Sequence, residues 1–528
     1  MLNIRHALLL AFLLLPGILH AQFFPKEGRR LNYRLIGFSF PGVSGNSVVE
    51  IASGYQNNEA SFEAHLLLKQ TCTTNKAALE VPEFGSNYTW RISQPGKNTK
   101  KDQPELHHFS TLSNPSLDTG VAHLRIISNK ENRKDIYVLV DALAALYDLN
   151  GNMVWFLPGL DPASVSYANI RDLKITPSGT ITYLSGDKAY EIDYDGNILW
   201  STPNTGEVSG EHTERYHHEF TKLSNGHYMI LGNEPITLPL PLYHIDSTLP
   251  SQDGTIFYEN DTFRQKLSLG TVVEYDKDGK VAWSWKSSGY FKHSDLFNHY
   301  TANGRFPVGD VHENSFYFDE KNKLLYVGFR DISRIVKVKY PTGTVMSEYG
   351  TRSKPGVDEL CNELFCGQHS IGKRTNGDIY LFNNNSLSTS AKPKIEILRE
   401  TGKPKNPLLK IWEYTCTTDG MTSEELSLAN KKNEKIQFMA QRTQKSLTKL
   451  RMSSGGNVIE MHDGSFFCSM SGDFGKMFIV RDHLVSWSAV AEKINTNNST
   501  WMSLPTYRAS IIEGNVMEQI LFHATLSK

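Results

Sequence analysis

Three histidines stand at the same position of a repeated phrase in this chain of 528 residues. His218, His312 and His369 each precede an alternating segment, a turn and an apolar run, which is typical of a strand that enters a hairpin. Copies of one unit bring such side chains together when they surround a common axis. The repeat therefore predicts a β-propeller whose central channel holds three imidazoles.

Arg330, which ends the next strand of the unit that begins at His312, should join this cluster. Imidazoles and a guanidinium offer many hydrogen-bond donors and few acceptors, so an oxyanion would fit among them. Three imidazoles with an open fourth position could also hold zinc. Arg330 counts against zinc, because its fixed charge repels a dication and suits a tetrahedral anion held by paired hydrogen bonds. We therefore expect neither a metal nor a cofactor.

A second phrase supplies the elements that must position the histidines. It consists of an apolar strand, a turn with glycine, and a strand that usually carries tryptophan, and its copies begin at Leu146, Glu191, Val273, Val336, Ile395 and Phe478. The large aromatic side chain can fill the wedge between neighbouring sheets. Six copies predict six blades. Two inner phrases, Arg171–Tyr183 and Gly456–Phe467, lack the histidine, so the fold needs the strand but not the imidazole.

The first part of the chain differs in pattern from the rest. Residues 22–125 alternate polar and apolar side chains without a helical period, as in Ser61–Leu68 and Tyr88–Ile92, with frequent turn formers between. This pattern predicts a small antiparallel β-sandwich of immunoglobulin or fibronectin type. We therefore expect an all-β protein, with the sandwich at residues 22–125 and the six-bladed propeller at residues 126–528.

Three segments interrupt the propeller pattern. Pro235–Leu269, with its prolines and aromatics, predicts a long loop over one mouth of the propeller. Thr422–Glu425 forms a capping box, so the charged run that continues to Lys449 predicts a surface helix. Trp501–Phe522 alternates as a strand does, and we expect it to return and complete the first blade.

The N-terminus has the pattern of a secretory signal peptide over residues 1–21. Arg5 supplies a positive charge, Ala7–Leu15 an apolar core, and Leu19–Ala21 a cleavage site. An uncleaved N-terminal anchor is the alternative. No later stretch approaches the roughly 20 apolar residues that span a bilayer. We expect an exported protein, periplasmic or secreted, without a membrane span.

Charge and cysteine content narrow the partners and the compartment. A formal net charge of -1 gives no electrostatic reason to expect nucleic acid or an anionic membrane as partner. In an exported protein five cysteines make disulfides possible, with at least one thiol left over. Cys361 and Cys366 are the best pair, since their bond would close a small ring just before His369. The pairing of Cys72, Cys416 and Cys468 stays open.

Several phrases together resemble the bacterial aryl sulfotransferase family, also called arylsulfate sulfotransferases. They span roughly residues 130–520 and comprise His217-His218-Glu-Phe, Asp310-Val-His312-Glu-Asn314-Ser315 with Gly328-Phe-Arg330, Gln368-His369-Ser and Tyr507-Arg508-Ala509. The resemblance implies a six-bladed propeller behind a small β-sandwich. It also implies sulfuryl transfer from an aryl sulfate to a phenol without a nucleotide sulfate donor.

The resemblance also implies roles for individual residues. His369 would attack sulfur and carry the sulfuryl group as a sulfohistidine, while His218, His312 and Arg330 would bind sulfate oxygens and assist the phenols. The matching phrases add Asn314, His217 and Gln368 as substrate-binding residues. The chain departs from the family at Phe382-Asn383-Asn384, where Phe-Asp-Asn is usual, and at Glu219, where Asp is common.

One competing interpretation is a non-catalytic or quinone-binding exported propeller, because Asp-x-x-Gly-x-x-x-Trp repeats also occur in quinoprotein blades. Such proteins have no need of channel histidines beside an arginine, so the residues favour the transferase. The expected partners are small aryl sulfates and phenols. A monomer and a homo-oligomer both stay open.

Overall fold

The structure is a computed structural model. It describes residues 23–42, 46–94, 104–114, 121–159, 170–241, 250, 254–297, 311–350, 361, 364–385, 392–403, 406–426, 455–470, 474–495 and 497–526. The predicted signal peptide and most of the helix predicted after Thr422 lie outside the described residues. Within them, no helix is long and apolar enough to cross a membrane.

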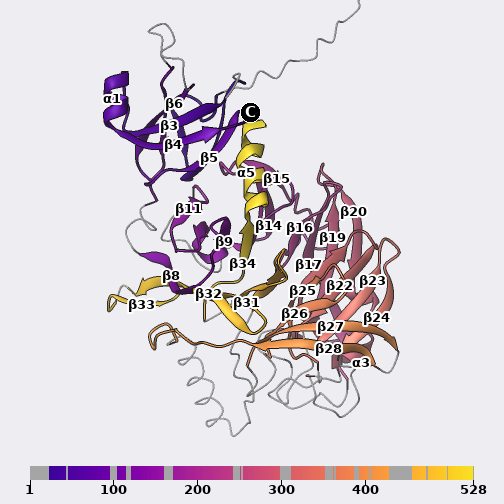
Figure 1. Ribbon diagram of the computed structural model, residues 1–528. Helices are drawn as coiled ribbons and strands as arrows, with labels where there is room; N and C mark the ends of the chain where they lie inside the picture. The colour runs from indigo at the N-terminus through magenta and orange to yellow at the C-terminus, as the bar shows by residue number, and fades with distance from the viewer. Residues whose placement is uncertain are drawn as a thin grey trace, which may run out of the picture.

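Two sheets that share one hydrophobic core form the N-terminal part (Figure 1). Phe38 of the smaller sheet lies edge-on to Trp90 of the larger one, with ring centroids 5.1 Å apart. The strands of both sheets pair antiparallel, except that β1 and β7 pair parallel. The larger sheet has the order β1 (Arg29–Leu31), β7 (His107–Thr111), β6 (Asn87–Ser93), β3 (Ser47–Ser53) and β4 (Leu66–Cys72), and the smaller sheet pairs β2 (Leu35–Ser39) with β5 (Lys76–Glu80).

A short helix replaces part of one predicted strand. Residues 61–68 were expected to be extended, but α1 spans Glu59–Ala64 and β4 begins only at Leu66. The Asn58 side chain accepts a hydrogen bond from the Ser61 backbone N–H at 2.9 Å, which caps the helix. The capped helix therefore forms although the short alternation of polar and apolar residues favours a strand. The strand predicted around Tyr88–Ile92 is confirmed as β6.

Six antiparallel sheets follow in the described part of the chain. The first contains β34 (Ala509–Glu513), β9 (Ile136–Val140), β10 (Ala145–Asp148) and β11 (Met153–Phe156), and the second β12 (Arg171–Ile175), β13 (Ile181–Ser185), β14 (Lys188–Ile192) and β15 (Ile198–Ser201). The third contains β16 (Phe220–Lys222), β17 (Tyr228–Pro239), β19 (Thr262–Tyr275) and β20 (Val281–Lys286), with β18 (Ile256–Glu259) beside β19.

The remaining three sheets repeat the same order. The fourth contains β21 (Glu313–Asp319), β22 (Leu324–Phe329), β23 (Arg334–Lys339) and β24 (Thr344–Gly350), and the fifth β25 (His369–Lys373), β26 (Ile379–Asn383), β27 (Lys394–Lys403) and β28 (Asn406–Thr415). The sixth contains β29 (Asn457–Glu460), β30 (Phe466–Met470), β31 (Lys476–Arg481) and β32 (Leu484–Asn495), with β33 (Thr500–Ser503) and β8 (Ala122–Asn129) against β32. Short helical segments are α3 (His293–Phe297), η1 (Asp141–Leu143) and η4 (Ser287–Gly289).

Tryptophan side chains join neighbouring sheets at five of the six junctions, as the repeated phrase predicts. The Trp155 indole N–H donates to the Tyr194 carbonyl of the second sheet at 2.7 Å, and that of Trp487, in the sixth sheet, donates to the Leu149 carbonyl of the first at 2.8 Å. Trp200, Trp283 and Trp412 make corresponding contacts with Tyr228, Pro341 and Phe466. Between the fourth and fifth sheets, Glu400 instead accepts from Tyr326 and Lys337.

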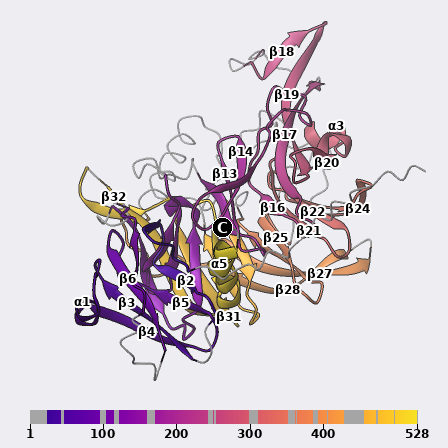
Figure 2. The ribbon, with the colours of Figure 1, turned by 90° about the horizontal axis from the view of Figure 1, so that it is seen from above.

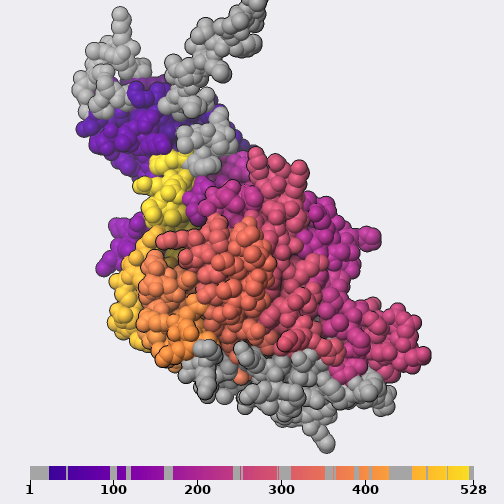
Figure 3. All heavy atoms as spheres, turned by 90° about the vertical axis from the view of Figure 1, so that its right-hand side faces the viewer, coloured from indigo at the N-terminus to yellow at the C-terminus, as the bar shows by residue number. Residues whose placement is uncertain are grey.

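The two ends of the six-sheet region are built into its first and last sheets. β34 pairs with β9, so the predicted return of the C-terminal segment to the first sheet is confirmed. β8 pairs with β32 of the sixth sheet. The second half of the predicted strand is instead the helix α5 (Gly514–Leu526), which packs Leu521 into the N-terminal core. Figure 3 shows this yellow helix against the indigo N-terminal part.

The segment predicted as a long loop is largely an extended β-arm. β17 and β19 stay paired from Tyr228 with Tyr275 to Pro239 with Arg264, and the arm projects from the rest of the molecule (Figure 2). Leu231 directs its N–H and carbonyl toward the β16 side of β17, so by alternation Pro235 and Pro239 direct their missing N–H groups to that side, where β16 has ended. Proline is tolerated there because no ladder bond is lost.

Gly37 of β2 tests how α5 is docked. A Cβ atom at this position would lie 2.8 Å from the Leu521 carbonyl oxygen and 2.9 Å from the Leu521 Cβ. Gly37→Ala should therefore lower the free energy of unfolding by about 1–3 kcal/mol, as overpacking does. Urea unfolding measures this loss. Gly42→Ala is the matched control, since its Cβ meets nothing within 4 Å, and equal stability of both variants would contradict the docking.

Candidate active site

The three predicted histidines lie together, although they come from three sheets. The ring centroid of His218 is 4.8 Å from that of His312 and 6.4 Å from that of His369. The ring of Tyr507, from the segment that leads into β34, lies 5.5 Å from His218. The structure thus confirms that the repeat gathers these imidazoles, and it adds a tyrosine that the sequence-based site lacks.

The three histidines do not occupy identical positions in their sheets, so that part of the prediction is wrong. His369 is the first residue of β25 and pairs with Phe382, whereas His218 and His312 precede β16 and β21 and have left-handed φ angles of 63° and 53°. In the fifth sheet Ser370, one residue later, has the corresponding angle of 51°. The strand pairing is irregular at the start of β21 and of β25. Each irregularity changes the position of the nearby histidine relative to its sheet.

Asn384 sets the tautomer of His369. Its side-chain NH₂ donates to the Gly455 carbonyl at 2.6 Å, which turns its Oδ1 toward His369 Nδ1 at 2.7 Å. An amide oxygen only accepts, so Nδ1 of His369 carries the proton and Nε2 of the neutral ring has a lone pair. Burial, followed by the electrostatic effects of Arg330 and His312, holds the pKa of His369 well below its usual range. The ring is therefore neutral and nucleophilic at Nε2 near pH 7.

Arg330 lies beside this cluster, as predicted. Its backbone N–H donates to the His312 carbonyl at 3.0 Å, and its Nε donates to Asp331 at 2.7 Å. The side chain is almost fully buried. Besides its effect on His369, it is one of the charges that, together with burial, hold the pKa of His218 well below its usual range. Arg330 is thus a cation held next to two neutral imidazoles, where an anion would be stabilised.

Asn314 and Gln368 hold the strand of His369. The Asn314 NH₂ donates to the Gln368 carbonyl at 2.6 Å, and the Gln368 NH₂ donates to the Arg334 carbonyl at 3.0 Å. Both side chains are fully buried. These contacts tie the fourth sheet to the residue just before the histidine, so the two amides that were predicted to bind substrate also have a positioning role.

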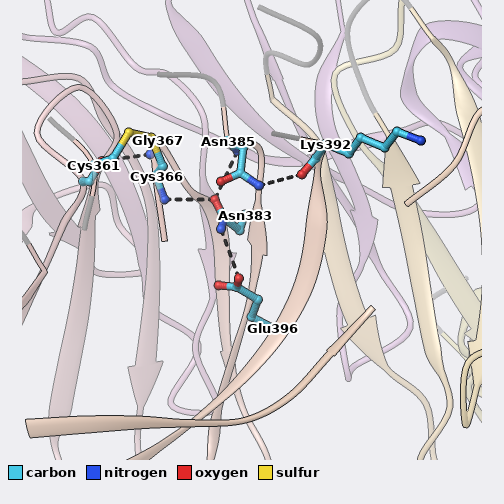
Figure 4. Close-up of a disulfide and its surroundings, with 8 residues drawn as sticks. Cys361, Cys366, Gly367, Asn383, Asn385, Lys392 and Glu396 are labelled. Carbon is cyan, nitrogen blue, oxygen red and sulfur yellow. Dashed lines mark hydrogen bonds between the residues drawn. A yellow bond between two sulfur atoms is a disulfide. The ribbon is translucent and has the colours of Figure 1, made fainter. Parts of the chain in front are cut away.

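The predicted disulfide between Cys361 and Cys366 is present and precedes His369 (Figure 4). The Cys366 N–H donates to Asn383 Oδ1 at 3.0 Å, and the Gly367 N–H donates to the Ser333 hydroxyl at 2.9 Å. The loop is therefore tied to both neighbouring sheets. The three cysteines whose pairing stayed open, Cys72, Cys416 and Cys468, are buried thiols.

The departure from Asp to Asn at position 383 has a local explanation. Asn383 donates from its NH₂ to Glu396 Oε1 at 3.1 Å, as Figure 4 shows. Glu396 is fully buried, and burial raises its pKa. An aspartate at 383 would face this carboxylate as a like charge. The amide keeps the acceptor for the Cys366 N–H and removes that repulsion.

A buried ion network next to the histidines was not identified from the sequence. Arg508 donates to Asp172 at 2.7 Å and to Glu219, and its second nitrogen donates to the Asn314 carbonyl at 3.2 Å. Lys174 contacts both Asp172 and Glu219. The two cations balance the two carboxylates. The only sequence signal for Arg508 was its place in the phrase Tyr507-Arg508-Ala509, which carried no assigned role.

Residues 252–435 match the family model described as Arylsulfotransferase (ASST). The matched range includes His312, Arg330 and His369. The resemblance to the aryl sulfotransferase family is confirmed. His218 and Arg508, which complete the cluster, lie outside the matched range. A comparison with curated proteins found no match.

Solved structures similar to this chain have low identity to it. A protein of unknown function from Bacteroides caccae is 11% identical with a TM-score of 0.36, over 71% of this chain and 98% of its own. A putative 6-phosphogluconolactonase from Bacteroides fragilis NCTC 9343 is 10% identical with a TM-score of 0.31, over 75% and 99%. The Cps50 (Swd1) β-propeller domain of Myceliophteria thermophila is 7% identical with a TM-score of 0.28, over 63% and 95%. Values this low assign no function to the chain.

Arg508→Met should destabilise the protein strongly. It leaves Asp172 and Glu219 with Lys174 as their remaining cation in the network, and breaking a buried ion network costs about 3–5 kcal/mol. The native pKa values of the two acids should then rise, so the native state takes up protons as pH falls. The decrease in the free energy of unfolding should therefore be largest at pH 7 and become smaller toward pH 5.

Urea unfolding at several pH values measures this, with Arg508→Met combined with Glu219→Gln as the matched control. The second substitution removes one uncompensated charge and should recover part of the stability. A loss for Arg508→Met that stays below about 1 kcal/mol, or that does not change with pH, would contradict the network.

Proposed function

We propose that this protein is an exported aryl sulfotransferase that moves a sulfuryl group from an aryl sulfate to a phenol through a sulfohistidine at His369. The observation that carries the proposal is the unprotonated Nε2 of His369 beside Arg330 and the His218–His312 pair. The family match supports aryl sulfotransferase activity in general.

The geometry suits two successive displacements. Nε2 of His369 attacks sulfur, the bond from sulfur to the aryl oxygen breaks with its electron pair going to that oxygen, and the phenolate leaves. An accepting phenol then gives up its O–H proton to a neighbouring imidazole and attacks the same sulfur, and the electron pair of the nitrogen–sulfur bond returns to Nε2. Charge spreads over three sulfuryl oxygens in each transition state, and Arg330 with the imidazoles supplies preorganised donors for it. One nucleophile thus serves donor and acceptor in turn.

The scaffold that we propose for this site is a six-bladed propeller behind a small N-terminal β-sandwich. The six sheets, and the tryptophan contacts at five of the six junctions between them, including the junction of the sixth sheet with the first, support this architecture. The boundary predicted between residues 125 and 126 falls within β8. Because β8 pairs with β32 of the sixth sheet, we place the boundary between the two domains just before β8.

Export to the periplasm or the medium is part of the same proposal. The signal-like segment at residues 1–21 and the Cys361–Cys366 disulfide support it, since disulfides persist in oxidising compartments. Small aryl sulfates and phenols are the proposed substrates.

A single-turnover experiment tests the covalent step. Purified mature protein mixed with excess 4-nitrophenyl sulfate and no acceptor should release about one equivalent of nitrophenol per site in a burst. Peptide mass spectrometry should then find one added sulfuryl group on His369. His369→Asn should abolish both signals, whereas His462→Gln, at an exposed histidine of the sixth sheet, should change neither. A label on His312 or on a tyrosine would overturn the assignment.

The pH dependence of kcat/KM tests the role of Asn384. Because the pKa of His369 is held well below its usual range, protonation should not inactivate the enzyme until the pH is well below about 6.5. Asn384→Asp would place a carboxylate on the Nδ1 proton, which favours the imidazolium and raises the pKa of His369. The acid limb should therefore move to higher pH in that variant, and an unchanged limb would remove Asn384 from this role.

A further inference from the structure

A fourth imidazole, that of His217, extends the histidine cluster into a chain of hydrogen bonds. His312 Nε2 lies 3.1 Å from His218 Nε2, and His218 Nδ1 lies 2.7 Å from His217 Nδ1. His217 Nε2 in turn lies 3.2 Å from the Gly232 carbonyl oxygen. Three rings are therefore joined nitrogen to nitrogen, and the chain ends on a backbone acceptor.

The carbonyl at the end sets the direction of the whole chain. A carbonyl oxygen only accepts, so His217 Nε2 carries a proton and, in the neutral ring, its Nδ1 accepts. His218 must then donate from Nδ1 and accept at Nε2, and His312 must donate from Nε2. Each neutral ring has one N–H, and all of these point from His312 toward Gly232.

We propose that His312, His218 and His217 form a proton relay for the phenol oxygen, with His217 as the outer end. This inference rests on the proposed function. His312 exchanges the proton with the phenol through its second ring nitrogen, so His217 acts through the two inner rings and does not touch substrate. It would thus be a relay residue, a role different from the substrate binding that the sequence predicts for it.

Attack by the accepting phenol moves one proton along the relay. When the accepting phenol attacks sulfur, its O–H bond breaks and the proton goes to His312. His312 passes its Nε2 proton to His218, and His218 passes its Nδ1 proton to Nδ1 of His217, which becomes an imidazolium. The new bond joins oxygen to sulfur, and the old nitrogen–sulfur pair returns to His369. The same transfers in reverse supply a proton to the departing phenolate of the next donor.

Electrostatics favour the outer end for the charge. Burial, together with His217, His312, His369 and Arg330, keeps His218 from holding a proton. The adjacent carboxylate, Glu219, is engaged by Lys174 and Arg508 and so does not offset Arg330. When the proton reaches His217, the positive ring is stabilised by the Gly232 carbonyl, which accepts from its Nε2. His218, the ring that contacts His312, is then neutral again. His217 is partly exposed, as are His218 and His312, and as the last ring of the chain it can pass the proton to water.

His217→Gln distinguishes a relay role of His217 from a merely structural role. Glutamine keeps a donor for the Gly232 carbonyl and an acceptor for His218, but it binds no proton. We expect the burst with 4-nitrophenyl sulfate, whose leaving group needs no proton, to keep its normal rate. Release of phenol from phenyl sulfate, and transfer from the sulfated enzyme to phenol, should slow by about 10²-fold, the low end of general acid–base contributions. Transfer to 4-nitrophenol, measured at a mildly alkaline pH where this phenol is largely ionised, should be spared.

The controls distinguish the possible failures. His227→Gln changes a histidine of the same sheet that contacts Glu274 instead, and it should leave all four rates unchanged. If His217→Gln slows all substrates equally, His217 is structural and the relay is wrong. If wild-type protein gives no burst and no label on His369, the proposed function itself fails.

A second measurement covers the case in which the variant does not fold. The rate of the wild-type enzyme with phenyl sulfate and phenol is measured in mixtures of H₂O and D₂O. A curved dependence on the deuterium fraction shows that more than one proton moves in the transition state and supports the relay, whereas a linear dependence shows one moving proton and overturns it.

Discussion

The charge pairing of Arg508 is the interaction on which the rest of the site depends. One guanidinium contacts Asp172 of the second sheet, Glu219 beside β16 of the third, and the Asn314 carbonyl of the fourth. It also belongs to the segment that leads into β34, which completes the first sheet. Burying these charges is tolerable only because every member has an opposite partner. The network therefore brings the returning C-terminal segment and three further sheets to one point next to the histidines.

The burial that makes such pairing necessary also prepares the chemistry. Burial holds the pKa values of His369 and His218 well below their usual range, so both rings stay neutral beside the cation Arg330. Asn384 then selects which nitrogen of His369 is nucleophilic, and Gly232 sets the direction of the other three imidazoles. A buried site with a fixed pattern of donors needs little reorganisation when charge develops on a sulfuryl group.

Much of the scaffold was predictable, because turns and wedge tryptophans are local signals. The phrases around Trp155 and Trp487 predicted hairpins that join neighbouring sheets, and both do. The Cys361–Cys366 pairing is equally local. Pro235 and Pro239 were misleading, because a proline is compatible with a strand when its missing N–H faces an unpaired edge, and only the partner strands decide which edge that is.

The sequence by itself determined which chemical groups are present and roughly where the strands begin. It did not determine the register of His369 relative to His218 and His312, because single-residue irregularities at the strand starts shift each side chain. The tautomer of His369 depends on Gly455, which is 71 residues from Asn384, and the neutralisation of Arg508 depends on Asp172, which is 336 residues away. Tertiary structure decided these features because hydrogen bonding and charge pairing act through space, and residues distant in the chain meet only after the sheets have closed on one another.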